Sequence, residues 1–162
     1  MAELPNPTAA LQARFQAIHH GAMQGLPMLN AVLHVQALGF RHWQGHWLGV
    51  LLTPWFMNLV LMPRRSELWL SIGERETRHH VFPAGVFEFI GAHDTELGDY
   101  QACSLLSPMF EFDNQASADA TALAALEALF DVDNMPGAAA MPAARSKREF
   151  MFGASHRDGH GP

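Results

Sequence analysis

An uncharged, strongly apolar run over residues 47–63 dominates this sequence, and Thr53-Pro54-Trp55 interrupts it in the middle. A helix that crosses a membrane needs about 20 predominantly apolar residues, and a proline inside a helix removes a backbone donor. We therefore interpret the run as two buried strands joined at this break. Neighbouring strands that are apolar on both faces lie inside a sheet that is covered on both sides. The cover is either the chain's own helices or a partner.

The composition fits a single domain with few charges. The chain has 162 residues, of which 49% are hydrophobic and 16% are charged, whereas soluble chains average about 25% charged residues. A surface this poor in charge is typical of a protein that gives surface to a partner, or of a compact domain with neutral polar loops. The formal net charge of −6 disfavours nucleic acid as a partner, because nucleic-acid binding needs a basic face.

The single cysteine and the N-terminal residues both bear on localisation. Cys103 is the only cysteine, so an internal disulfide cannot form, which agrees with a reducing compartment. The first residues, MAELPNPTAALQARF, lack the basic and apolar regions of a signal peptide. We therefore expect a cytoplasmic protein without membrane insertion.

The spacing of apolar residues predicts an α+β fold. A helix is expected from Asn6-Pro7-Thr8 to about Gly25, because asparagine caps helices and proline suits their first position. A second, alanine-rich helix is expected over residues 116–130. Between the helices, alternating side chains predict six or seven strands, near residues 31–38, 46–52, 56–62, 67–72, 78–82, 86–90 and 100–106. The expected fold is a mostly antiparallel sheet with an N-terminal and a C-terminal helix packed on it.

The C-terminal part of the sequence changes in character. Residues 133–144 are rich in alanine and proline and are interpreted as a linker, and the last ordered piece ends at Gly153. We therefore predict a single domain over residues 1–153 and a flexible tail over residues 154–162.

No cluster of residues predicts catalysis or a metal site. The chain has ten histidines, but His42 and His46 have no Glu or Cys nearby to complete a site. The adjacent His79 and His80 would point to opposite faces of a strand. No nucleotide-binding or hydrolase motif is present, so we expect no enzyme activity, no metal and no cofactor. Cys103 stays open between a buried structural thiol, a redox or partner-related thiol and a nucleophile.

Two motifs, LTPWFMNL over residues 52–59 and YQACSLLSPM over residues 100–109, carry a resemblance to a known family. Together with Trp47-Leu48-Gly49 and Phe152-Gly153, they resemble the [NiFe]-hydrogenase assembly chaperones of the HybE/HupJ/HoxT family over residues 6–153. The resemblance implies a non-catalytic chaperone that binds hydrogenase precursors in the cytoplasm. Its clients would be the small subunit with its twin-arginine signal peptide, the large subunit, or both. It would hold them until cofactor insertion and assembly or export.

The resemblance also bears on other partners and on alternative functions. Some relatives carry a fused rubredoxin domain, whereas this chain lacks the cysteines for one. A separate rubredoxin-like maturation factor is therefore a further expected partner. One alternative function is a thiol-dependent redox-protective protein that uses Cys103 during iron–sulfur cluster maturation. Another is a structural subunit that stays in the mature complex.

We expect the client-binding site around the two motifs. Trp55 would be its anchor, because tryptophan is enriched among interface hot spots, and methionine suits it because its flexible side chain adapts to peptide partners. The expected site residues are Thr53, Pro54, Trp55, Phe56, Met57, Cys103, Ser104, Ser107, Pro108 and Met109. In the alternative interpretation, Pro54 and Pro108 only end strands and Trp55 packs in the core.

A second, acidic feature lies between the last two predicted strands. Asp94, Glu96 and Asp99 would form a rim that meets the paired arginines of a twin-arginine signal peptide, because complementary potentials steer encounter. The alternative is an ordinary solvated loop.

Overall fold

A computed structural model of the chain describes residues 3–132. The elements follow in the order α1 (Thr8–His20), β1 (Gln36–Trp43), β2 (His46–Leu52), β3 (Met57–Pro63), η1 (Ser66–Leu68), β4 (Thr77–Phe82), β5 (Gly85–Asp94), β6 (Gly98–Leu106) and α2 (Gln115–Ala128). The strands form one six-stranded antiparallel sheet in the order β1-β2-β3-β6-β5-β4. This architecture confirms the predicted α+β fold with an N-terminal and a C-terminal helix.

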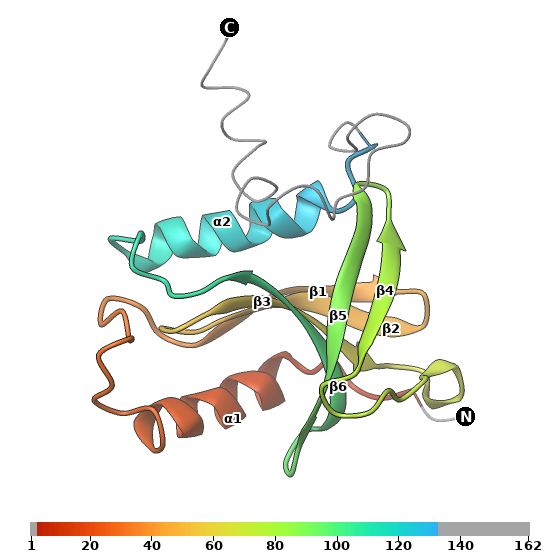
Figure 1. Cartoon of the computed structure of the whole chain (residues 1–162), viewed down its shortest axis with the longest axis horizontal. Helices are drawn as coiled ribbons and strands as arrows, with labels where there is room; N and C mark the ends of the chain where they lie inside the picture. Colours follow the sequence, from red (N-terminus) through yellow and green to blue (C-terminus); the bar gives the residue numbers. More distant parts are fainter. Residues whose placement is uncertain (1–2, 133–162) are drawn as a thin grey trace, which may run out of the picture.

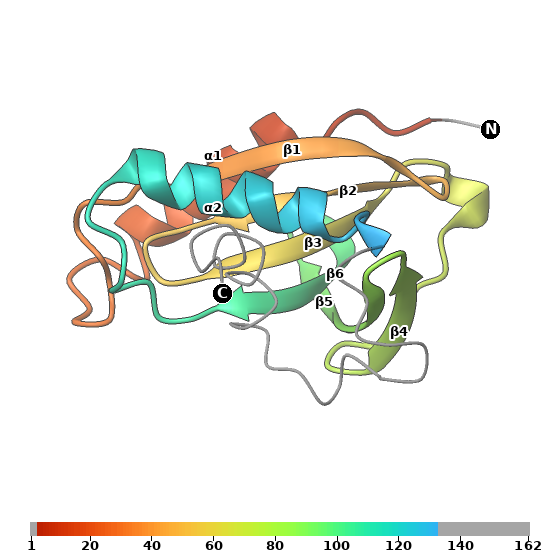
Figure 2. The same cartoon turned by 90° about the horizontal axis from the view of Figure 1, so that it is seen from above.

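The chain's own helices cover both faces of β2 and β3. On one face, Leu11 and Phe15 of α1 pack in a cluster with Val60 of β3. On the other face, Leu126 of α2 packs in a cluster with Val50 of β2. Figures 1 and 2 show the two helices on opposite sides of the sheet. The apolar run at residues 47–63 is therefore the middle layer of a helix–sheet–helix domain, and no partner is needed to bury it.

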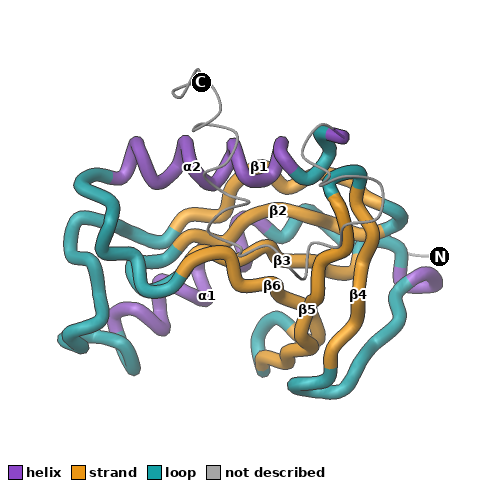
Figure 3. The backbone as a smooth tube through the Cα atoms, turned by 45° about the horizontal axis from the view of Figure 1, so that its top comes forward, coloured by secondary structure: helices purple, strands orange, loops and turns teal. Residues whose placement is uncertain are grey.

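The sheet curls over the face that α2 covers. Trp43 of β1 stacks on Phe82 of β4 with ring centroids 4.5 Å apart, although β1 and β4 are the two outermost strands. The backbone N–H of Ala84 also donates to the carbonyl oxygen of Leu129 at 2.9 Å, which ties the β4–β5 turn to the end of α2. Figures 1 and 3 show β4 and β5 standing across the other strands. The curl therefore brings together side chains from strands that are not neighbours in the sheet.

The first strand differs from its prediction in both position and length. It starts at Gln36, later than the predicted residue 31, and it continues to Trp43, beyond the predicted residue 38. Gly39 has a φ of 69°, and the pairing with β2 shifts in register between Leu38 and Arg41. The glycine therefore marks a β-bulge that continues the strand instead of a turn that ends it.

The strand predicted over residues 67–72 is wrong. Its first residues belong to the short helix η1, where Glu67 pairs at 2.8 Å with Arg65, the residue before the helix, and the rest forms no ladder. The segment connects β3 to β4, which are separated in the sheet by β6 and β5, so it crosses the end of the sheet and does not join it. Alternation alone does not distinguish such a crossing segment from a strand.

Several predictions about the C-terminal part fall outside the described residues. These are the linker at residues 133–144, the Phe152-Gly153 motif, the domain boundary at residue 153 and the tail at residues 154–162. Among residues 3–132, no helix has the length and apolar character needed to cross a membrane.

We predict that Gly49→Ala destabilises the fold. A Cβ atom at this position would lie 2.4 Å from the ring of Phe40, and overpacking of this kind costs typically about 1–3 kcal/mol. Chemical denaturation of the wild type and the variant measures the loss in free energy of unfolding. Phe40→Ala should cost less in the Gly49→Ala background than in the wild type, because it removes the ring that clashes. Equal stability of Gly49→Ala and the wild type would contradict the close contact.

Candidate client-binding site

Thr53 builds the turn between β2 and β3. Its backbone N–H donates to the carbonyl oxygen of Phe56 at 2.8 Å. Its Oγ1 accepts from the backbone N–H groups of Trp55 at 3.1 Å and Phe56 at 3.0 Å. Side-chain hydroxyls stabilise turns in this way, and the side chain of Thr53 is fully buried. Thr53 therefore shapes the turn that presents Trp55 and Phe56.

The two sequence motifs lie side by side in the sheet. β3 pairs with β6, so that Asn58 lies opposite Ser104 and Leu59 lies opposite Cys103. Beyond the paired residues, the Oγ of Ser107 donates to the carbonyl oxygen of Trp55 at 3.3 Å. The turn of the first motif and the end of the second motif therefore form one surface.

Asn30 joins this surface to the loop that follows α1. Its backbone N–H donates to the carbonyl oxygen of Pro54 at 2.9 Å. Its Nδ2 donates to the carbonyl oxygens of Met109 at 2.8 Å and Phe112 at 2.9 Å. Asn30, which is half-buried, thus ties three segments that are far apart in the sequence through its backbone and its side chain. Sequence reasoning missed Asn30, because an asparagine in a loop carries no signal that distinguishes it from a solvated one.

The predicted site residues divide by exposure. Those buried in the domain are Thr53, Pro54, Met57, Cys103 and Met109. Those exposed are Ser104, Ser107 and Pro108, whereas Trp55 and Phe56 are half-buried. Only the exposed and the half-buried residues are able to touch a partner without movement of the backbone.

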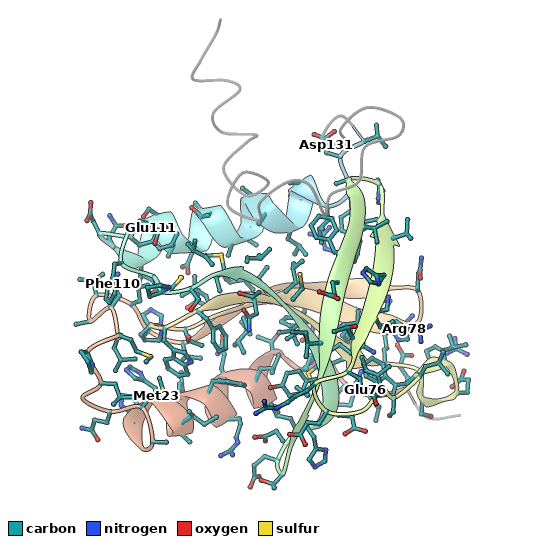
Figure 4. The ribbon with its side chains drawn as sticks, viewed as in Figure 1. Met23, Glu76, Arg78, Phe110, Glu111 and Asp131 are labelled. Carbon is teal, nitrogen blue, oxygen red and sulfur yellow. The ribbon has the colours of Figure 1, made fainter. Side chains whose placement is uncertain are left out.

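Four exposed apolar side chains lie next to this surface and were not predicted. Leu26 is 38% exposed, Met28 47%, Val32 51% and Phe110 56%. The segment with Val32 runs along the segment with Phe110, because the backbone N–H of His34 donates to the Oε1 of Gln115 at 2.8 Å and Asn30 bonds to both flanks of Phe110. Figure 4 shows Met23 and Phe110 at one end of the molecule, opposite Glu76 and Arg78.

We call this region the apolar end. It comprises Leu26, Met28, Val32, Trp55, Pro108 and Phe110. The four unpredicted members lie in loops without a period, so only their exposure in the folded chain identifies them.

Trp55 rests on the last turn of α1. Its ring centroid lies 5.6 Å from that of Phe56 and 6.0 Å from that of His19. Phe56 in turn meets Phe15 of α1 edge to face at 5.9 Å. Burial, and then the neighbouring charge of His20, lowers the pKa of His19, which favours a neutral imidazole beside the indole. Trp55 therefore packs in part against the domain, as the alternative interpretation expects, and is half-buried at the surface.

Cys103 lies inside the core, where it is only 1% exposed. It belongs to the cluster that α2 covers, together with Leu59 and Leu105. Buried thiols in apolar surroundings are inert, whereas reactive ones are partly exposed and near positive charge. Of the structural, redox-related and nucleophilic alternatives for Cys103, its environment therefore matches the structural thiol.

The acidic residues of the β5–β6 hairpin are engaged within the chain. Asp94 binds the Nε of Arg14 at 2.9 Å and accepts the backbone N–H groups of Glu96 and Leu97. Burial alone would raise the pKa of Asp94, but these hydrogen bonds and the arginine lower it overall. Asp99 accepts from His93 at 2.7 Å and from Ser71 at 3.1 Å. The hydrogen bond from His93 lowers the pKa of Asp99 most, and the hydrogen bond from Ser71 has the next largest effect.

The hairpin also lies apart from the apolar end. Its tip extends below the sheet in Figure 1, whereas the loops of the apolar end lie at the left. Glu96 is exposed as well. Its carboxylate takes no part in the hydrogen bonds that engage Asp94 and Asp99.

Comparison with known proteins places this geometry in a family. The sequence profile of the family described as "[NiFe]-hydrogenase assembly, chaperone, HybE" matches residues 6–153. The chain belongs to this family. The HybE family is a family of hydrogenase assembly chaperones, and the match confirms the resemblance carried by the two motifs.

Individual relatives agree with this assignment. The chain is 39% identical to Protein HoxT of Cupriavidus necator over an alignment that covers 92% of this chain and 89% of the relative. It is 39% identical to a protein of Rhodobacter capsulatus named "Probable rubredoxin HupJ" over 126 residues, which cover 78% of this chain and 45% of that longer relative. The solution structure of HybE from Escherichia coli shares the fold, with a TM-score of 0.63 and 24% sequence identity. That match covers 86% of this chain and 90% of the other.

We predict that Thr53 acts on stability through its hydroxyl. Thr53→Val keeps the shape of the side chain but leaves two backbone N–H groups without their acceptor, which costs roughly 1–3 kcal/mol when such groups are buried. Thr53→Ser keeps the hydroxyl and should lose less. Thermal unfolding of both variants measures the difference. If the serine variant were the less stable of the two, the hydroxyl would not be what holds the turn.

Proposed function

We propose that this member of the HybE family is a non-catalytic chaperone that holds a [NiFe]-hydrogenase precursor subunit at its apolar end. The client would be held until cofactor insertion and assembly or export. The observation that carries the proposal is the exposure of Leu26, Met28, Val32 and Phe110 beside the family's own motifs. Apolar side chains that gather on a surface mark interaction sites. The fitting ligand is an apolar segment that is buried in the mature enzyme but still exposed in its precursor.

The construction of the apolar end supports a binding role. The loops that carry Val32 and Phe110 are anchored through Asn30, and the turn that carries Trp55 is anchored through Thr53. A surface held in place before binding loses less conformational freedom when a partner binds. Met28 adds a flexible, polarizable contact suited to clients of differing shape.

The precursor of the small subunit with its twin-arginine signal peptide is the client we favour, in the cytoplasm and before export. A signal peptide combines an apolar stretch with positive charge. The apolar stretch fits the apolar end. We propose that the arginines meet the acidic hairpin chiefly at Glu96, because Asp94 and Asp99 already bind Arg14 and His93. The large subunit, which carries no such peptide, would use the apolar end alone.

A redox role through Cys103 is the second candidate, and its burial argues against it. Protection of a client from oxidation would then come from a separate rubredoxin-like partner. The name "Probable rubredoxin HupJ" for a longer relative supports this division, because the chain matches only 45% of that relative.

The proposal predicts that polar substitutions at the apolar end weaken client binding without unfolding the chaperone. Phe110→Ser should weaken binding of the small-subunit precursor by at least about tenfold, or ~1.4 kcal/mol, and Val32→Ser should weaken it by less. Isothermal titration calorimetry with purified precursor measures both effects, and circular dichroism checks the fold. Repeating the titration with a signal peptide at two salt concentrations tests the rim, because an attraction to Glu96 weakens as salt rises.

Val81→Ser is the matched control. Val81 is 66% exposed and lies on the edge strand β4, away from the apolar end. It should leave the affinity unchanged. Equal losses in Val32→Ser and Val81→Ser, or full affinity in Phe110→Ser, would contradict the assignment of the apolar end. Binding of the signal peptide that does not respond to salt or to Glu96→Gln would contradict the rim.

A further inference from the structure

A polar cavity lies at the end of the sheet opposite the Thr53 turn. Its volume is about 120 Å³, and His46, Trp69, Arg78, His80 and Gln101 contribute to its lining. A single ordered water needs only ~10–15 Å³ of such space, so the cavity has room for a small organic group. Figure 4 shows Arg78 on the side of the molecule away from Phe110, which separates this cavity from the apolar end.

The curl of the sheet assembles the cavity from strands that are not neighbours. His46 begins β2, His80 lies on β4 and Gln101 lies on β6. His80 nevertheless reaches Gln101, with 2.8 Å between its Nε2 and the Oε1 of the amide. Trp69, from the segment between β3 and β4, closes the cavity by meeting His46 edge to face at 5.3 Å. Neither the His42 and His46 spacing nor the adjacent His79 and His80 pair in the sequence predicts this meeting.

Two buried ring nitrogens of this lining have no hydrogen-bond partner among residues 3–132. They are the Nδ1 of His46 and the Nε1 of Trp69. An unsatisfied buried polar atom costs roughly 1–3 kcal/mol, so two in one cavity indicate a site that is completed by something it binds. The indole N–H is a donor only, and a ligand must therefore bring an acceptor.

The electrostatic surroundings favour an acceptor with negative charge. Burial lowers the pKa of His46, and the positive charges of His80, Arg64 and Arg78 lower it further, while a hydrogen bond to the backbone of Gly45 raises it in part. The charges that shift His46 are thus all positive. The acids nearest in sequence to the lining have partners of their own, since Glu67 pairs with Arg65, Glu76 accepts from the backbone N–H of Gly73 and Asp99 pairs with His93. An anion inside the cavity would offset this positive field.

We propose that this cavity binds a carboxylate, with Trp69 and His46 as donors inside and Arg78 as the charge partner at its mouth. One guanidinium and two ring N–H groups match the two oxygens of a monoanion. A phosphate dianion would need more donors. Leu68 and Leu70 also line the cavity and are 49% and 59% exposed, so a short apolar group attached to the carboxylate has a contact at the entrance. The source is a free small organic acid or a carboxylate on a peptide.

Nuclear magnetic resonance of the full chain tests the proposal with sodium acetate as the probe. At constant ionic strength, acetate should shift the indole N–H signal of Trp69 saturably, and sodium chloride should not. Acetate should also raise the pKa of His46, because the anion opposes the charges of His80, Arg64 and Arg78. Trp69→Phe keeps an aromatic ring but removes the donor, and it should weaken binding at least tenfold, read from the His46 signals. Trp47→Phe also removes an indole N–H, but Trp47 packs on the α1 face of the sheet and donates to the carbonyl oxygen of Leu4, so it should leave binding unchanged.

A second arm distinguishes the source of the carboxylate. A tripeptide that ends in leucine with a free carboxylate is compared with the same peptide amidated. Saturable binding of acetate supports a free acid, and binding of the free peptide alone supports a peptide carboxylate. The proposal is overturned if neither binds, if the amidated peptide binds as well as the free one, or if Trp69→Phe and Trp47→Phe behave alike in a folded chain. It is also overturned if Zn²⁺ shifts His46 and His80 while carboxylates do not.

Discussion

The burial of β2 and β3 on both faces is the constraint on which the rest of the structure depends. These strands carry almost no polar side chains, so water must be excluded from both sides of them, and α1 and α2 provide that cover. Because β2 and β3 are fixed in the middle layer, the turn at Thr53 and the start of β2 at His46 lie at opposite ends of the domain. Those two ends hold the two surfaces to which we assign binding.

The two ends differ in chemistry because different connections reach them. At the Thr53 end, the loops after α1 and after β6 meet through Asn30 and leave apolar side chains in water. At the His46 end, the crossing segment with Trp69 and the curled strand β4 enclose polar rings. The domain thus presents an exposed apolar surface at one end and a small polar cavity at the other, and the two share no residue.

The sequence predicted the middle layer well and the ends poorly, for physical reasons. Burial on both faces leaves a continuous apolar pattern, so β2 was predicted at its observed bounds and β3 within one residue. The pairing of the two motifs follows from strand order, which no local pattern reveals. Asn30 and Phe110 lie in loops, and their roles depend on the distant segments that pack against those loops in the folded chain. The meeting of His46 with His80 depends on the curl, across which Trp43 stacks on Phe82, and no local pattern predicts that contact between the two outermost strands.

Hydrogen–deuterium exchange of the full chain, with and without the small-subunit precursor, locates the client without any substitution. We expect slower exchange in residues 26–33 and 107–112, and unchanged exchange in β4. Protection confined to β4 and residues 68–70, with the loops around Asn30 exchanging as in the free chain, would contradict the assignment of the client to the apolar end.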